Sequence, residues 1–230
     1  YKAIAEGDYS TAIGKNAKAI KINSFAFGEN AKAKNDESYA IGRGALAEGF
    51  RSFAFGSAGI DSLGVVTGVA YAKGNYSFSF GQGAYASGIG AFAIGLADSA
   101  FGGYSTTMGY KNKSFGMYSA TLGYSNSATG IGSLAIGRLT TATGLYSFSA
   151  GYESVSSGAY SVALGYQDSA KSSYSMSIGF QTKTTSNYAF STGNATTASG
   201  SASLTTGFST KASGNYSFAA GYRTTAQCFS

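Results

Sequence analysis

Small and bulky side chains alternate in a pentad that recurs along nearly the whole chain. One copy is residues 161–165, Ser-Val-Ala-Leu-Gly, and another near the start is residues 10–14, Ser-Thr-Ala-Ile-Gly. The residue two places before the closing glycine is always Ala, Ser or Thr, whereas its two neighbours are mostly bulky and apolar, as in Phe25 and Phe27. Alternation with a period of two predicts a β-strand that has one small face and one bulky face.

The glycines that close the pentads, which we call the ruler glycines, are spaced fourteen residues apart with one exception. The exception is the step of twenty-five residues from Gly56 to Gly81. The repeats therefore form fifteen units, in a block of four and a block of eleven. The ruler glycines are Gly14, Gly28, Gly42, Gly56, Gly81, Gly95, Gly109, Gly123, Gly137, Gly151, Gly165, Gly179, Gly193, Gly207 and Gly221.

Each unit carries a second turn position seven residues before its ruler glycine. Glycine occupies that position in eleven units, and Ser lies four residues before the ruler glycine in thirteen of fifteen. Glycine suits corners because it tolerates positive φ and close backbone approach. A unit of two short strands and two turns cannot bury a hydrophobic face alone, so successive units must stack. The sequence predicts an all-β fold, a parallel β-roll (solenoid) of 14-residue coils with the ruler glycines at corners.

The long step divides the expected domain organisation into three parts. Residues 1–56 form a first β-roll block of four coils, 57–76 an irregular coil or loop, and 77–230 a second block of eleven coils. Residues 57–76 are still apolar and rich in glycine, so we expect one modified coil that is short by three residues. A protruding functional loop is the alternative, because loops carry function more often than scaffold does.

Composition excludes several classes of protein. The chain has 34 glycines, no proline and no histidine, with 11% charged and 15% aromatic residues. Disordered chains have few aromatics and high net charge, and collagen needs glycine at every third position. The net charge of +6 is spread without a concentrated basic patch, so we expect no nucleic-acid partner. No apolar run approaches eighteen residues, so we expect no membrane insertion by this segment.

Residues for catalysis or metal binding are sparse. Histidine, the commonest general base, is missing, and the ten carboxylates are scattered along the chain. Cys228 stands alone, without a partner for an intrachain disulfide, and is interpreted as a tolerated small residue. We expect no enzymatic activity and no cofactor. Because the repeat is already running at Tyr9 and is cut within a unit at Phe229, we expect the chain to be a segment of a longer protein.

Two stripes are candidate ligand-binding surfaces. The first is a basic stripe in the first block, suited to anionic polymers: Lys15, Lys18, Lys32 and Lys34. The second is a ladder of aromatic residues directly after the ruler glycines, suited to stacking against neutral sugars: Tyr110, Tyr124, Tyr152 and Tyr166. Glu29, Asp36 and Glu37 offset much of the charge of the basic stripe, which favours the ladder.

The bulky strand face predicts self-association. If small residues let the two sheets of a narrow coil approach closely, the bulky residues have no interior to enter. A row of them along about 70 Å of roll would be a very large exposed patch. We therefore expect an interface between copies of the chain that includes Phe27, Phe55, Phe80, Ile94, Leu122, Ile136, Leu164 and Ile178.

Units such as residues 160–166 and 128–137 closely resemble the head repeats of trimeric autotransporter adhesins, of the YadA-like or Hep/Hag type. The resemblance covers nearly the whole chain outside residues 57–76. It implies a left-handed parallel β-roll assembled as a homotrimer. It also implies an extracellular adhesin head on a bacterial cell surface, with host or target surface glycans or matrix proteins as partners.

Two alternative functions remain open. Similar repeats occur in fibre proteins of phages and of phage-like contractile injection systems, and the Tyr- and Thr-rich residues 214–225 resemble those at least as much. A fibre or cap adhesin on the exterior of such a particle is therefore the second hypothesis. An ice-binding solenoid is the weakest, because the threonine pairs are interrupted by Ser154, Asp168 and Lys183 at matching positions.

Overall fold

A computed structural model of the chain describes residues 2–60, 62, 63 and 65–227. It divides into two compact units, Tyr1–Tyr118 and Ser119–Ser230, which we call the N-terminal unit and the C-terminal unit. No helix occurs among the described residues. Cys228 lies outside them.

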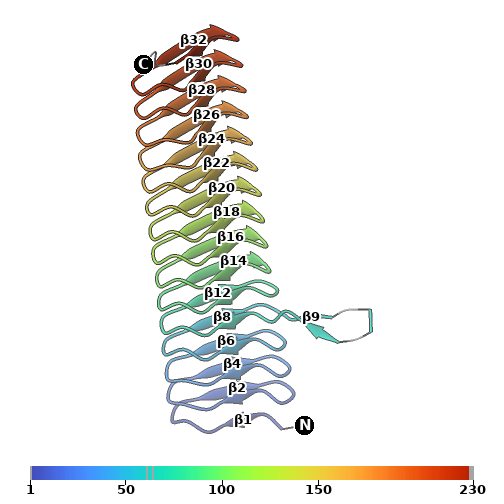
Figure 1. Ribbon diagram of the computed structural model, residues 1–230. Helices are drawn as coiled ribbons and strands as arrows, with labels where there is room; N and C mark the ends of the chain where they lie inside the picture. The colour runs from blue at the N-terminus through green and yellow to red at the C-terminus, as the bar shows by residue number, and fades with distance from the viewer. Residues whose placement is uncertain (1, 61, 64, 228–230) are drawn as a thin grey trace. The chain divides into compact units, whose positions relative to one another are not determined.

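Within each unit, every coil gives one two-residue strand to a short-strand sheet and one strand of three or five residues to a long-strand sheet (Figure 1). The short-strand sheet of the N-terminal unit contains β1 (Ile4–Ala5), β3 (Lys18–Ala19), β5 (Lys32–Ala33), β7 (Leu46–Ala47), β11 (Tyr71–Ala72), β13 (Tyr85–Ala86), β15 (Ser99–Ala100) and β17 (Lys113–Ser114). Its long-strand sheet contains β2 (Thr11–Ile13), β4 (Phe25–Phe27), β6 (Tyr39–Ile41), β8 (Phe53–Phe55), β12 (Phe78–Phe80), β14 (Phe92–Leu96) and β16 (Thr106–Tyr110).

The C-terminal unit repeats this arrangement. Its short-strand sheet contains β19 (Ser127–Ala128), β21 (Thr141–Ala142), β23 (Val155–Ser156), β25 (Ser169–Ala170), β27 (Lys183–Thr184), β29 (Thr197–Ala198), β31 (Lys211–Ala212) and β33 (Thr225–Ala226). Its long-strand sheet contains β18 (Ala120–Tyr124), β20 (Leu134–Arg138), β22 (Phe148–Tyr152), β24 (Val162–Tyr166), β26 (Met176–Phe180), β28 (Phe190–Asn194), β30 (Leu204–Phe208) and β32 (Phe218–Tyr222).

Neighbouring strands in both sheets are parallel and, except where β7 pairs with β11 and β8 with β12, in register at fourteen residues. Ala12 pairs with Ala26 in the N-terminal unit, and Ala163 pairs with Ser177 in the C-terminal unit. Equivalent positions of successive coils are therefore stacked on one another. The predicted parallel β-solenoid of 14-residue coils is confirmed.

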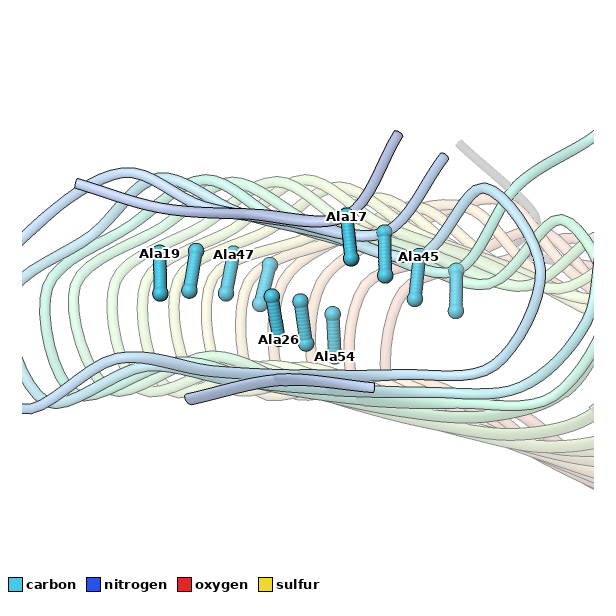
Figure 2. Packing of buried hydrophobic residues seen from close by; sticks show 11 residues of the cluster. Ala17, Ala19, Ala26, Ala45, Ala47 and Ala54 are labelled. Atoms are coloured by element: carbon cyan, nitrogen blue, oxygen red, sulfur yellow. The ribbon is translucent and has the colours of Figure 1, made fainter. Parts of the chain in front are cut away.

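The small strand face forms the interior and the bulky face points outward. Ala26 and Ala54 of the long-strand sheet are buried, as are Ala19 and Ala47 of the short-strand sheet. Figure 2 shows their methyl groups meeting in the narrow space between the two sheets. By contrast, the side chain of Phe27 is 48% exposed. The sheets approach so closely that only small side chains fit, which confirms the predicted assignment of the two faces.

Buried serines close the turn that precedes many of the long strands. The Ser161 hydroxyl donates a hydrogen bond of 2.7 Å to the carbonyl oxygen of Gly158. Ser105 makes the same bond to Gly102, and Ser203 makes it to Gly200. The backbone N–H of Ser161 also donates to this carbonyl, at 3.2 Å, so the backbone and the side chain of the serine both close the turn. The side-chain bond explains why Ser recurs four residues before the ruler glycine.

The ruler glycines adopt backbone conformations that other residues resist. Gly137 has φ of +119°, and a Cβ at this position would overlap the carbonyl oxygen of Gly151 one coil further on. In the strands from β14 onward the ladder continues through these glycines, because Gly95 pairs with Gly109 and Gly137 pairs with Gly151. The sequence predicts that the ruler glycines lie at corners. In these coils each ruler glycine lies inside a strand instead, with a positive φ.

A further row of inward side chains lies three residues after the ruler glycines. It is alanine in the first coils, as at Ala17 and Ala31, and later becomes polar. The buried polar members include Asp98, Asn112, Asn126, Thr140, Ser154, Asp168, Thr182, Thr196 and Thr210.

Hydrogen bonds between successive coils satisfy part of this polar row, whereas Asp98 Oδ2 and Thr210 Oγ1 are buried without a partner. The backbone N–H of Asn112 donates to Asp98 Oδ1 at 2.7 Å, and that of Thr140 donates to Asn126 Oδ1 at 2.9 Å. Burial raises the pKa of the Asp98 carboxyl to about 6 and also raises the pKa of Asp168. Each side chain acts as a backbone acceptor for the coil that follows.

The extra residues of the twenty-five-residue step do not form a short coil. Ala58 still donates a hydrogen bond to the carbonyl oxygen of Arg43 in the preceding coil, at 2.8 Å. Strand β7 pairs directly with β11, joining Leu46 to Tyr71, and β8 pairs directly with β12. Between them, β9 (Gly59–Ile60) and β10 (Val66–Thr67) form an antiparallel hairpin, which Figure 1 shows projecting from the N-terminal unit. The expected modified coil is therefore wrong, and the protruding loop is what the structure contains. The long step equals one full coil plus eleven residues, too few for another coil.

Candidate binding surface

The hollows on the described surface are open and shallow. One of about 320 Å³ lies between Tyr9, Phe25 and Tyr39 on the N-terminal unit. Another of about 240 Å³ lies at the base of the hairpin, between Thr67, Gln82 and Leu96. Neither gathers convergent charged groups, so the candidate surfaces are the rows of side chains on the outside of the coils.

Ion pairs partly neutralise the predicted basic stripe. Lys15 pairs with Glu29 at 3.3 Å, and Lys34 pairs with Glu48, in each case one coil further on. Burial alone would raise the pKa of Glu48, but hydrogen bonds from Lys34 and Tyr71 outweigh it and lower that pKa. The exposed pairs contribute about 0–1 kcal/mol each. Their main effect is to reduce the positive potential of this face.

Lys18 and Lys32 are the unneutralised part of the stripe. They pair in register between β3 and β5, and both side chains are exposed. Like charges placed directly opposite each other on neighbouring strands repel. The structure brings these two lysines together as predicted, on the short-strand sheet of the N-terminal unit.

The predicted tyrosine ladder lies in a row directly after the ruler glycines. We call it the post-glycine row; in the C-terminal unit it begins with Tyr124, Arg138, Tyr152, Tyr166 and Phe180. The rings of Tyr152 and Tyr166 are stacked with centroids 5.0 Å apart and planes 9° apart, and Tyr166 stacks on Phe180 at 4.8 Å. Tyr110 belongs to the N-terminal unit, where the Lys111 ammonium lies 5.0 Å from its ring centre.

Stacking within the ladder changes how it can bind a ligand. Because the rings of Tyr152, Tyr166 and Phe180 cover one another's faces, a sugar has no free face inside the row on which to stack. The ring edges and the phenolic hydroxyls remain accessible, and Tyr166 is 39% exposed. The ladder therefore offers a line of hydrogen-bonding groups at intervals of about one coil, instead of the stacking platform that the sequence suggested.

Arg138 is a member of this row that the tyrosine pattern did not reveal. It occupies the position after Gly137 where neighbouring coils carry tyrosine. Its guanidinium carbon lies 5.4 Å from the ring centre of Tyr124 and 5.4 Å from that of Tyr152. The row thus places a cation between two rings, an arrangement that stabilises the guanidinium by about 0.5–2 kcal/mol per ring. A break in the tyrosine spacing was the clue in the sequence.

Polar side chains flank the ladder one position further along. Gln167 donates to the Glu153 carboxylate at 2.7 Å, and Gln181 donates to Gln167 at 2.9 Å. A hydrogen bond with Glu153 raises the pKa of the Tyr152 phenol. The amides and carboxylate of this flanking row are therefore coupled to one another from coil to coil.

A second aromatic ladder lies five residues before the ruler glycines. Tyr146, Tyr160, Tyr174 and Tyr188 are stacked in succession, with centroids 5.6, 5.1 and 5.1 Å apart. Each has positive φ, between 50° and 58°, a conformation that costs non-glycine residues on the order of 1 kcal/mol. Stacking and the turn hydrogen bonds offset that cost, so this ladder has a structural role in the turn.

The described parts of the chain lack two other kinds of feature. No three His, Cys, Asp or Glu side chains gather there in a way that would hold a metal ion. Nor do those residues include a helix that is long and apolar enough to cross a membrane.

Comparison with protein families agrees with the fold. The model of the YadA head domain repeat, which spans two copies of the repeat, matches residues 1–17, 5–31, 19–45, 33–58, 72–96, 122–140, 128–152 and 142–167. Together these segments cover more than half of the chain, and they lie in both units. A search of curated proteins found no match. The coil length, the ruler glycines and the matched segments agree, and the chain belongs to the YadA head domain repeat family.

Proposed function

We propose that this chain is the non-enzymatic head of an extracellular adhesin, in which three left-handed β-rolls assemble into a homotrimer and attach to a host or target surface. The observation that carries the proposal is the outer face of the long-strand sheets. This face is apolar although it is not covered within the chain. A protein that exposes such a face needs a partner, and a second and third copy supply identical rows.

The uncovered face carries bulky apolar side chains in most coils of the N-terminal unit and in several coils of the C-terminal unit. In the N-terminal unit Phe55 stacks on Phe80 at 5.0 Å, and Tyr39 stacks on Phe53 at 4.7 Å. In the C-terminal unit Leu122 is 47% exposed, and Ile136, Leu164 and Ile178 are partly exposed. Complete burial of a side chain of this size stabilises by about 1.5–3 kcal/mol. A row of such side chains can therefore hold three subunits together without a covalent bond.

Attachment by the trimer depends on many weak contacts that are repeated in successive coils and in the three subunits. Rows such as the post-glycine row present similar groups in successive coils, and a trimer presents each row three times. Weak contacts that act together on one particle gain avidity that none has alone. A rigid solenoid suits this mode because binding does not have to order a flexible surface first.

The test of attachment uses cells and immobilised matrix proteins as targets. The purified chain, a Tyr152→Ala/Tyr166→Ala variant and a Lys18→Ala/Lys32→Ala variant are compared in the amount retained after washing. We expect retention of the wild type, a loss of several-fold for the tyrosine variant, and little change for the lysine variant. Retention of none of the three on any target contradicts an adhesive function and leaves the segment as a passive spacer.

A further inference from the structure

Arg138 contacts aromatic rings of two neighbouring coils. Arg223 lies over the ring of Tyr222 at 5.1 Å, and Lys111 lies over that of Tyr110 at 5.0 Å. Arg51 lies over Phe50 but also forms two hydrogen bonds with Glu37, at 2.7 and 3.1 Å. Arg138 has a ring on each side, Tyr124 and Tyr152. Two rings fix the plane of the guanidinium, whereas one ring leaves it free to swing.

The guanidinium of Arg138 is not used by the fold. The ion pairs of the described chain, Lys15–Glu29, Lys34–Glu48 and Arg51–Glu37, all lie in the first coils. No described carboxylate lies within 4.0 Å of the guanidinium, and none of its N–H groups donates to a described side chain or carbonyl. Glu153, which follows Tyr152, is engaged by Gln167. The exposed side chain therefore keeps its hydrogen-bonding capacity for something outside the chain.

The geometry selects the kind of ligand. The rings of Tyr124 and Tyr152 belong to the coils on either side of Arg138, each with its centre 5.4 Å from the guanidinium carbon. The N–H groups of a guanidinium lie in one plane. This fork matches the two oxygens of a planar carboxylate. The groups beside it in the row are the hydroxyls of Tyr152 and Tyr166, flanked by the amides of Gln167 and Gln181. Such groups suit a ligand rich in hydroxyls, and the row offers no apolar pocket for peptide side chains.

We propose that Arg138, held between Tyr124 and Tyr152, is the anchor of a binding site for the carboxylate of an acidic sugar, with the Tyr152 and Tyr166 edges contacting the sugar hydroxyls. This site specifies the ligand class of the adhesive surface proposed above, and it rests on that function. It lies on strands β18–β24 of the C-terminal unit, and each copy of the chain carries one.

The experiment compares ligands that differ only in charge. Polygalacturonic acid and its methyl ester have the same backbone, but only the first has free carboxylates. A sulfated polysaccharide and a poly-glutamate peptide are the other two probes. Binding of each to the intact chain is measured at fixed ionic strength, because screening weakens exposed charge contacts. We expect the acid to bind at least about tenfold more tightly than the ester.

Variants distinguish binding by the Arg138 guanidinium from a general effect of the net charge of the chain. Arg138→Gln and Arg223→Gln remove the same charge, but only the first removes the guanidinium between two rings. Arg138→Lys keeps the charge and loses the fork. We expect Arg138→Gln to weaken binding of polygalacturonic acid about tenfold or more, Arg138→Lys to weaken it severalfold, and Arg223→Gln to leave it unchanged. All variants should keep the molar mass and melting temperature of the wild type.

Several outcomes would overturn the site. These are equal losses for Arg138→Gln and Arg223→Gln, equal binding of acid and ester, tighter binding of the sulfated polysaccharide or of poly-glutamate, or a changed molar mass for Arg138→Gln. Retention on cells is measured in parallel for the wild type and Arg138→Gln. If both are retained equally, the acidic-sugar site is wrong while the adhesive function stands; if the wild type is not retained on any target, the adhesive function itself fails.

Discussion

Gly137 and Gly151 face each other in register on neighbouring strands, and a Cβ on Gly137 would overlap the carbonyl oxygen of Gly151. Gly137 also has φ of +119°. Two separate constraints, the backbone conformation and the close approach of the next coil, therefore exclude other residues at this position. The same pair of constraints recurs at Gly95, Gly165 and Gly179.

Replacement of Gly137 by valine should unfold the roll more readily than replacement of an exposed residue of the same unit. The strained backbone costs on the order of 1–3 kcal/mol per chain, and the overlap with Gly151 adds to it. The matched control is Lys183→Val, on an exposed position of β27. We expect thermal melting followed by circular dichroism to show a lower transition for Gly137→Val only. Equal melting temperatures would contradict the assignment of the ruler glycines.

Replacement of Asp98 by asparagine should stabilise the chain at neutral pH. Burial raises the pKa of Asp98 from 3.8 to about 6. Between these values the folded chain holds a proton that the unfolded chain has lost. The free energy of unfolding therefore falls as pH rises through this window and stays lower above it, by on the order of 2–3 kcal/mol. Asparagine already occupies the equivalent place one coil on, where the Asn112 amide donates to the Met108 carbonyl.

The measurement for Asp98 is the free energy of unfolding of wild type and variant at several pH values from 3.5 to 7.5, from denaturant titrations. The difference between the two should be small near pH 3.8 and grow up to pH 6. Asp8→Asn, at an exposed turn, should show no such growth. A difference that does not change with pH would rule out a buried, proton-binding Asp98.

Removal of the hairpin should leave the coils intact. Replacing residues 57–69 by the dipeptide Ser-Gly restores the fourteen-residue step and puts glycine where Gly44 and Gly83 have positive φ. Because β7 already pairs with β11, and β8 with β12, no ladder hydrogen bond is lost. We expect a melting temperature within a few degrees of wild type. A collapse of the β-sheet signal would show that the hairpin is part of the fold.

The regular part of the fold could be predicted from the residue spacing because every coil places small residues inside and bulky residues outside at the same positions. The small residue between two bulky ones, as at Ala163, identifies the interior strand face, and the glycine interval gives the register. The protruding loop was only the alternative interpretation, because a step of twenty-five residues does not reveal whether the extra residues join the stack. Only the pairing of β7 with β11 decides that.

The buried polar row and Arg138 were missed for different reasons. Asp98 and Asn126 look like surface residues in a sequence, but both are buried, and each accepts a hydrogen bond from a backbone N–H of the next coil. The tyrosine ladder was recognised from its spacing, but that spacing brings the rings face to face and so removes the stacking surface that a sugar would use. Arg138 interrupts the ladder in the sequence. Only the structure shows that its guanidinium contacts the rings of both neighbouring tyrosines.

In the proposed homotrimer, two further copies of the chain cover the apolar outer face of the long-strand sheets. Light scattering coupled to size-exclusion chromatography measures this directly as the molar mass in solution. We predict a single species with three times the 23.3 kDa mass of one chain. A monodisperse species of 23.3 kDa, with the face around Phe27 and Leu122 left in water, would contradict the claim.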